Sequence, residues 1–264
     1  MLFPPTAAAA LIDLTEVAFA ELLGTLPGAT VQREHGLHWV DTGRPEGALN
    51  GVQMAPDDGD DHVFVGAIAQ AVTHFRGRRL PFHWRTGLRP EPAEAGRLLT
   101  LNGFTMVDRE PGMWADLDTP LPAPPPVQDL TIQPVRDDAA LRDWTEVWGH
   151  DAPAEVTARW FDVYRQLPRR DLTFLLGTIG GVPVATCYLF RISGVAAIHY
   201  VVTLPAYRRR GIGAAMTIAA MRAAQESGCH VAVLMASALG EPVYRRLGFQ
   251  ECCRVDTYAW HPRA

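Results

Sequence analysis

Three consecutive arginines, residues 208–210, stand directly before Gly211 and Gly213, where an apolar run gives way to an alanine-rich helix. The amino end of a helix presents unpaired backbone N–H groups and the positive end of the helix dipole, which suit a phosphate or pyrophosphate. Glycine removes the Cβ atoms that would hold an anion away from these amides, and arginine adds positive charge. This turn is therefore predicted to bind phosphate.

Two purely structural explanations compete with phosphate binding. A glycine-rich turn into a helix can serve close packing against a sheet, and a run of arginines is usually a solvated edge. A dinucleotide fingerprint is set aside, because Met216 replaces its third glycine and no strand with an acidic ribose partner follows at the required distance. The coincidence of glycines and arginines at one strand-to-helix junction favours phosphate binding.

The elements around the turn alternate as in an α/β domain. Apolar runs separated by the pairs Gly180-Gly181 and Ser193-Gly194 predict a meander of strands. The predicted strands are 130–135, 172–179, 182–190, 195–203, 230–236 and one that begins at Phe249; the predicted helices are 137–149, 153–166, 211–226 and a short one that ends near Leu247.

A proline-rich stretch divides the chain. The sequence TPLPAPPP at 119–126 favours an extended connector and excludes both a helix and a central strand. We therefore expect a first domain at 1–118, a linker at 119–127 and a second domain at 128–264.

The two halves resemble each other weakly. Residues 98–117 and 243–260 both run helix, Gly-Phe, strand, and 63–87 supplies a helix and a strand that match 211–236. A diverged tandem repeat explains both similarities, and the alternative is two unrelated segments that share a common turn. The first half has no counterpart of the arginine and glycine turn.

The composition narrows the function classes. The 264 residues carry a net charge of −5, so no bulk field attracts the molecule to nucleic acid or to anionic lipid. All 24 basic residues are arginine, which removes Schiff-base chemistry and the lysine-dependent phosphate loop. The serines stand only at 193, 227 and 237 and form no Gly-x-Ser-x-Gly elbow, which argues against a nucleophilic hydrolase.

The cysteines and the N-terminus predict a cytoplasmic protein. Cys187, Cys229, Cys252 and Cys253 show neither CxxC spacing nor an extracellular disulfide framework, which favours a reducing compartment and no metal site. The apolar N-terminus lacks a basic region before it, and acidic residues interrupt it at helical intervals, so we expect a helix of the fold there. No stretch reaches the roughly 18 to 20 apolar residues of a bilayer-spanning helix.

The turn and its surroundings resemble a known family. The run from Arg208 to Gly213 resembles the R/Q-x-x-G-x-G/A acetyl-CoA signature of the GNAT acyltransferase superfamily, and SALGEPVYRRLGF at 237–249 is similar to its closing helix with a tyrosine and Gly-Phe. The resemblance spans about residues 129–260. More narrowly, the whole chain resembles bacterial two-half GNAT proteins whose first half has lost the cofactor turn.

This resemblance implies an α/β (α+β) fold of tandem GNAT-like domains, each with a mixed, mostly antiparallel central sheet flanked by helices. The domain at 1–118 would be degenerate and lack the CoA loop, and the domain at 128–264 would be catalytic and bind acetyl-CoA. In the superfamily, a bulge near the end of the fourth strand splays it from the fifth, and the pantetheine arm of the cofactor lies in the gap.

Carried onto this chain, the resemblance implies a set of cofactor contacts. Backbone groups of Val201, Val202 and Thr203 would pair with the pantetheine arm, and one N–H would polarise the thioester carbonyl. Ser237 stands where many members have an asparagine that contacts the cofactor. The residues that would wrap the pyrophosphate, chiefly through backbone amides, are Arg208, Arg209, Arg210, Gly211, Ile212, Gly213 and Ala214.

Two residues are the catalytic candidates. Tyr244 stands where the superfamily often keeps a general acid, so its hydroxyl would protonate the departing CoA thiolate. His199 is the candidate base for the amine, because it lies four residues before Thr203 and therefore on the same face of the strand. A chain of waters is the alternative base, and Glu146 and Glu241 are weaker candidates.

We expect the acceptor to contact the helices at 137–166, with the N-terminal half as a further candidate surface. Their aromatic residues should point mainly into the core, so that one or two meet a ligand. These residues are Trp144, Trp148, Trp160, Phe161 and Tyr164.

The sequence thus predicts an acyl-CoA-dependent N-acyltransferase that moves acetyl from acetyl-CoA to a primary amine of a small molecule or peptide by direct attack. The alternative is a catalytically silent CoA-binding sensor or scaffold. We expect no metal, no nucleic acid and no membrane partner, and a cytoplasmic monomer or homodimer. A nucleic-acid-binding module that uses arginine pairs is disfavoured by the acidic net charge.

Overall fold

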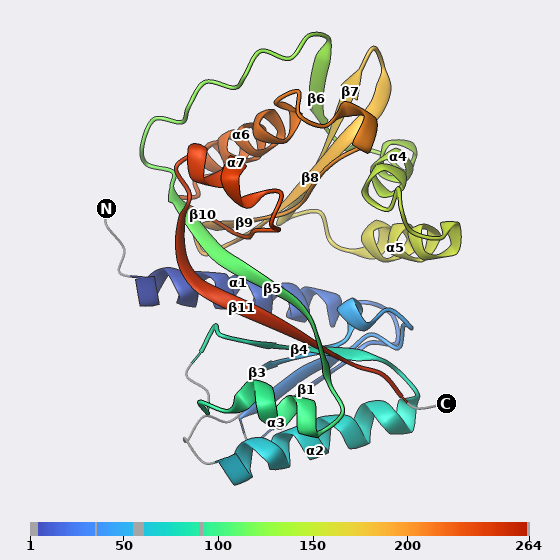
Figure 1. Cartoon of the computed structure of the whole chain (residues 1–264). Coiled ribbons are helices and arrows are strands. Elements are labelled where there is room, and N and C mark those ends of the chain that lie inside the picture. The colour runs from blue at the N-terminus through green and yellow to red at the C-terminus, as the bar shows by residue number, and fades with distance from the viewer. Residues whose placement is uncertain (1–4, 35, 55–60, 90–91, 263–264) are drawn as a thin grey trace. The chain divides into compact units, whose positions relative to one another are not determined.

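The structure, a computed structural model, describes residues 5–34, 36–54, 61–89 and 92–262. These residues divide into two compact units (Figure 1). Unit 1 comprises residues 113–251, and unit 2 comprises residues 5–112 and 252–262. Two strands, β5 (Thr105–Asp116) and β11 (Gln250–Trp260), begin in one unit and end in the other.

Unit 1 is a mixed sheet flanked by helices. Strands β6, β7, β8 and β9 pair antiparallel in sequence order, and β10 runs parallel to β9. The unit contains β6 (Leu130–Pro134), α4 (Asp138–Trp148), α5 (Ala154–Gln166), β7 (Leu172–Ile179), β8 (Val182–Ile192), β9 (Val195–Thr203), η2 (Pro205–Tyr207), α6 (Ile212–Glu226), β10 (Val231–Met235) and α7 (Glu241–Arg246).

Local signals explain why these elements begin and end where they do. The carboxylate of Asp137 accepts a hydrogen bond from the Ala140 N–H at 2.8 Å and so caps α4. Gly194 takes a positive φ in the turn between β8 and β9, and Gly228 takes one just after α6. The predicted α/β class, with a mixed sheet between helices, is confirmed.

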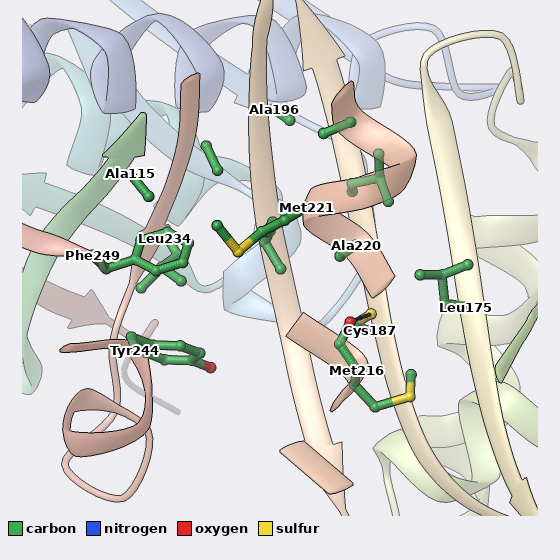
Figure 2. Close-up of a cluster of buried hydrophobic side chains, with 14 of the residues drawn as sticks. Ala115, Leu175, Cys187, Ala196, Met216, Ala220, Met221, Leu234, Tyr244 and Phe249 are labelled. Atoms are coloured by element: carbon green, nitrogen blue, oxygen red, sulfur yellow. Dashed lines mark hydrogen bonds between the residues drawn. The ribbon is translucent and has the colours of Figure 1, made fainter. Parts of the chain in front are cut away.

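Helices cover both faces of the unit 1 sheet. On one face, α6 packs into a core that is rich in alanine and contains sulfur side chains. Met216 and Met221 of the helix lie among residues of the strands there (Figure 2). Successive residues of β8 separate the two faces: the Cys187 thiol lies 3.8 Å from the Met216 carbonyl of α6, whereas the Tyr188 ring lies 6.3 Å from the Trp144 ring of α4. Side chains on β8 and β9 can therefore be assigned to an α6 face or an α4/α5 face.

The strands of unit 2 also combine parallel and antiparallel pairing. Strands β1, β2 and β3 pair antiparallel, β3 runs parallel to β4, and β11 pairs antiparallel with β4. Its elements are α1 (Pro5–Leu23), β1 (Thr30–Glu34), β2 (Leu37–Asp41), η1 (Gly47–Leu49), β3 (Gly51–Met54), α2 (Asp61–Arg78), β4 (Phe82–Thr86), α3 (Ala95–Leu101), and the residues of β5 and β11 given above. The helix and strand expected within 63–87 are α2 and β4, and the helix, Gly-Phe and strand of 98–117 are present as α3 and β5.

The compact units do not coincide with the order of the chain. From Cys252 onward the last strand belongs to unit 2, because it pairs along β4, while linker residues Leu121 and Val127 pack against the unit 1 core. The domain boundaries at 118 and 128 stay a prediction. The parts of these domains at 1–4, 35, 55–60, 90–91 and 263–264 lie outside the described residues.

Glu110 of β5 gives unit 2 a predicted pH dependence. Burial, with the nearby carboxylates of Asp108 and Glu16, raises the pKa of Glu110 to about 7, although the Arg85 guanidinium opposes the shift. Because the folded state holds this proton more tightly than the unfolded state, the group favours folding at acidic pH and loses that contribution as the pH rises toward 7. We expect Glu110→Gln to be more stable than the wild type above pH 7. The free energy of unfolding in urea should also change less with pH in the variant, over the range between the ordinary pKa of a glutamate and the folded-state pKa of about 7. An unchanged profile would contradict the assignment.

Candidate functional site

The residues between β9 and α6 form the predicted phosphate-binding turn. The 3-10 turn η2 leads into the arginines, and Gly211 stands directly before α6. The Nε of Arg208 donates to the Thr203 carbonyl at 2.9 Å, which ties the turn to β9. The three arginine side chains are exposed, and none forms an ion pair within the described part of the chain. Their charge is therefore available at the amino end of α6.

The two glycines of the turn have different explanations. Gly211 has a φ of +83°, and a Cβ there would lie 3.1 Å from Pro125, so the fold alone accounts for it. Gly213 is helical, and a Cβ there would meet Thr203 Oγ1 at 3.9 Å, an ordinary contact distance. Because glycine inside a helix costs about 1 kcal/mol relative to alanine, the fold does not account for Gly213. Its bare backbone fits a ligand that approaches the first turn of α6 closely.

A β-bulge interrupts β9 near its carboxyl end. The register with β8 shifts so that Tyr200 and Val201 together oppose Cys187. Tyr200 has a φ of +51°, a left-handed conformation that aromatic residues rarely adopt. The bulge that the family resemblance implies is therefore present.

Two side chains hold the bulge through main-chain carbonyls. The Thr186 hydroxyl donates to the Tyr200 carbonyl at 3.1 Å. The indole N–H of Trp144 donates to the Cys187 carbonyl, also at 3.1 Å. Both donors are buried, so the bulge is anchored from β8 and from α4. Sequence reasoning missed this role for both residues; the available signals were a hydroxyl inside the apolar run 182–190 and a tryptophan on an otherwise polar helix turn.

The bulge lies beyond the point where β9 stops pairing with β10. As far as the chain is described, this parallel ladder joins Val195–Val231, Ala196–Ala232 and Ala197–Val233. Residues 201–203 therefore continue past the ladder, on the side of β9 where β10 would otherwise pair. Main-chain groups beyond the end of a ladder can pair with an extended chain that carries its own amide groups.

His199 faces α4 and α5. Its ring stacks on that of Tyr188 with centroids 5.0 Å apart. The prediction that His199 and Thr203 share a face is wrong, because the bulge places an extra residue between them and reverses the alternation of side chains. Thr203 faces α6 instead, close to Gly213. The role of His199 as a base stays a prediction.

Tyr244 of α7 is buried in the same core as Phe249 and Leu234 (Figure 2). Its ring lies directly over Gly240, where a Cβ would approach Tyr244 Cε2 to 2.7 Å and Oη to 3.2 Å. The missing side chain at Gly240 therefore leaves the space that the tyrosine ring fills. Sequence reasoning did not single out Gly240; its signal was a glycine four residues before the tyrosine, one helical turn away.

Of the remaining predicted residues, Ser237 and Glu241 have local partners. Ser237 Oγ accepts a hydrogen bond from the Gly240 N–H at 3.2 Å, just before α7. The serine therefore has a structural role there, and its contact with CoA stays a prediction. Glu241 is paired with Arg245 at 2.7 Å, and Glu146 is exposed on α4. Both carboxylates remain weaker candidates for the base.

Other kinds of site find little support in the described residues. No group of three or more His, Cys, Asp or Glu side chains among them is placed to hold a metal ion. No helix in this part of the chain is both long and apolar enough to cross a membrane. A cavity of about 500 Å³ in unit 1 is lined by Trp114, Leu121, Met221 and Arg246 among others, and its lining includes none of the predicted site residues.

The structure thus places the glycine and arginine turn at the amino end of α6, the bulge near the end of β9 and the tyrosine on α7. Residues 137–249 match the family described as acetyltransferase (GNAT) family. This part of the chain is therefore a GNAT domain. A comparison with curated proteins gave no match.

Solved structures show the same architecture over the whole chain. A GCN5-related N-acetyltransferase from Kribbella flavida has a TM-score of 0.73 and 22% identity, over 95% of this chain and 96% of its own. A GCN5-related N-acetyltransferase from Sphaerobacter thermophilus has a TM-score of 0.66 and 19% identity, over 98% and 94%. A tandem GNAT protein from the clavulanic acid biosynthesis pathway has a TM-score of 0.62 and 12% identity, over 99% and 98%. These likenesses show a tandem GNAT fold.

Proposed function

We propose that this chain is an acetyl-CoA-dependent N-acetyltransferase that acts on a primary amine of a small molecule or peptide. The observation that carries the proposal is Gly213, whose absent side chain the fold does not require, at the amino end of a helix beside exposed arginines. The bulged end of β9 supports it, because it offers main-chain groups past the β10 ladder.

The turn would hold the pyrophosphate of the cofactor. The N–H groups of residues 211–214 have no partner inside α6, since the first helical bond runs from the Ala215 N–H to the Gly211 carbonyl at 3.0 Å. These N–H groups would donate to the phosphate oxygens, and the charges of residues 208–210 would add to the helix dipole. Backbone groups of Val201, Val202 and Thr203 would pair with the pantetheine arm, and Ser237 would contribute one hydrogen bond.

Two side chains would transfer protons in the reaction. Bound acetyl-CoA would supply an activated acetyl thioester for direct attack by the amine. Tyr244 Oη would donate a proton to the leaving thiolate, with the ring held in place over Gly240. His199, or a water beside it, would accept the proton that the acceptor ammonium must lose. A main-chain N–H at the end of β9 would stabilise the charge that develops on the carbonyl oxygen.

We assign the reaction to the domain at 128–264 and propose that the domain at 1–118 binds no CoA. The segment between β3 and α2 occupies the chain position that corresponds to the turn between β9 and α6. This segment and the first residue of α2 carry Asp57, Asp58, Asp60 and Asp61, where the second half has arginines. Four carboxylates would repel a pyrophosphate rather than attract it.

The test combines binding with turnover. Acetyl-CoA is added to the full chain in a thermal unfolding assay, and release of free CoA is then measured with a panel of primary amines, with mass spectrometry of the products. We expect stabilisation by acetyl-CoA and an N-acetylated product with at least one amine. Stabilisation without turnover on any amine would indicate the silent CoA-binding protein, and no stabilisation at all would contradict the site.

A further inference from the structure

The α4/α5 face of the unit 1 sheet carries a cluster of aromatic rings centred on the bulge. Tyr200 is at its centre, with ring centroids 5.2 Å from Trp148, 5.6 Å from Tyr188 and 6.4 Å from His199. The other rings are Trp144, Trp160, Tyr164 and Phe174, each within ring-contact distance of a neighbour in the cluster. The proposed reaction uses none of these rings except that of His199.

Exposure divides this cluster into a closed part and an open part. Trp144, Tyr164, Phe174 and Tyr188 are at most 2% exposed, and Trp160 is 5% exposed, so they form core. Trp148, His199 and Tyr200 are only half-buried. We call these three residues the bulge aromatic surface. Of the aromatic residues expected on the two helices, Trp148 is thus the one that is not buried.

The bulge is what brings this surface together. In a regular strand, successive side chains point to opposite faces, so His199 and Tyr200 could not share one. The extra residue and the left-handed backbone at Tyr200 place both rings on the α4/α5 face, where each contacts Tyr188. A bulky aromatic residue in this sparsely populated conformation points to a use for its side chain, since glycine or asparagine would adopt it more easily.

We propose that Trp148 and Tyr200 form the surface that binds the acceptor, and that the acceptor is a primary amine carried by an aromatic ring. This inference rests on the proposed function. Tyr200 directly precedes residues 201–203, which would hold the acetyl donor, so a ring packed on Tyr200 places its amine within one or two residue steps of about 3.3 Å. Aromatic faces favour flat apolar partners through offset stacking.

The recognition is therefore made by ring faces rather than by a charge pair. His199, the third member of the surface, would lie on the amine side of the bound acceptor and Trp148 on the ring side. An aliphatic primary amine would keep its contact with His199 but would lose the stacking. Discrimination between aryl and alkyl amines is the measurable consequence.

The experiment compares 2-phenylethylamine with n-butylamine, two primary amines with the same reacting group. The wild type, Trp148→Leu and the control Phe161→Leu are assayed for CoA release. Phe161 is a suitable control because it is a buried aromatic residue of α5 whose ring contacts the guanidinium groups of Arg142 and Arg165. We expect kcat/KM to favour the aryl amine about 10-fold in the wild type and in the control, and Trp148→Leu to lose that preference through KM.

Several outcomes separate this inference from the proposed function. A wild type that acetylates n-butylamine as well as the aryl amine, or a Trp148→Leu variant that keeps the preference, overturns the aromatic surface and leaves the acetyltransferase standing. If neither amine is acetylated, saturation-transfer NMR of the CoA-bound protein decides. Phenyl signals that appear with the wild type and vanish with Trp148→Leu support the surface, and their absence with the wild type overturns it. Absence of any acetyl-CoA stabilisation defeats the proposed function separately.

Discussion

Gly213→Glu is expected to weaken acetyl-CoA binding about 100-fold while the protein stays folded. The new side chain would place a negative charge and extra atoms at the first turn of α6, where the backbone N–H groups would otherwise meet the pyrophosphate. The loss of one or two charge-assisted hydrogen bonds, each contributing about 1.5–3 kcal/mol, accounts for an effect of this size. The fold itself has room, because the nearest atom to a Cβ at Gly213 is Thr203 Oγ1 at 3.9 Å.

The effect can be read as a loss of ligand-induced stability. Acetyl-CoA at about 100 times its Kd stabilises a protein by about 2.7 kcal/mol, and a 100-fold weaker complex at the same concentration gains only about 0.4 kcal/mol. For a chain of this length, 1 kcal/mol corresponds to about 2–4 °C in Tm. The response should therefore shrink from several degrees to about one.

Two further variants make this test specific. Gly66→Glu is the matched control, because Gly66 is also a helical glycine with room for a side chain; it is exposed on α2 of unit 2, whereas Gly213 is half-buried. It should keep the full acetyl-CoA response. Gly213→Ala should raise the Tm of the free protein slightly, since alanine favours a helix, and still reduce the response. An equal response in all four proteins would remove the turn from the binding site.

Most elements of the second half could be predicted from the sequence because their signals are local. Apolar runs between Gly180-Gly181 and Ser193-Gly194 mark β7, β8 and β9, and Gly228 marks the end of α6. The turn is marked by its residue types and spacing, and the family resemblance points to Tyr244. The weak similarity between the two halves also predicted α2, β4, α3 and β5 of the first half.

The face of His199 could not be predicted in this way. Counting alternate residues along β9 assumes an unbroken strand, and the extra residue at Tyr200 becomes visible only in the pairing with β8. The same holds for Thr186 and Trp144, whose role is to donate to carbonyls that only the bulge exposes. The place of residues after Cys252 in unit 2 likewise depends on their pairing with β4, far away in the sequence.

Tyr244→Phe is expected to lower kcat by about 100-fold or more and to leave acetyl-CoA affinity nearly unchanged. General acid catalysis typically contributes 10²–10⁴-fold, and phenylalanine removes the proton donor alone. The phenyl ring should still pack over Gly240 and against Phe249, whose ring centroid is 5.8 Å from that of Tyr244. Steady-state kinetics with a good amine acceptor, together with the acetyl-CoA thermal response, separate the two effects.

Two variants distinguish proton donation from packing. Tyr258→Phe makes the same change at another buried tyrosine, in β11 within unit 2, and should leave kcat unchanged. Gly240→Ala keeps the Tyr244 hydroxyl but pushes the ring aside, because the new Cβ would lie 2.7 Å from Tyr244 Cε2. If the hydroxyl acts as an acid from this position, Gly240→Ala lowers kcat as well, since a shift of about 1 Å is enough to disrupt a catalytic geometry. A Tyr244→Phe variant with wild-type kcat would show that the tyrosine only fills the core, and that water protonates the leaving thiolate.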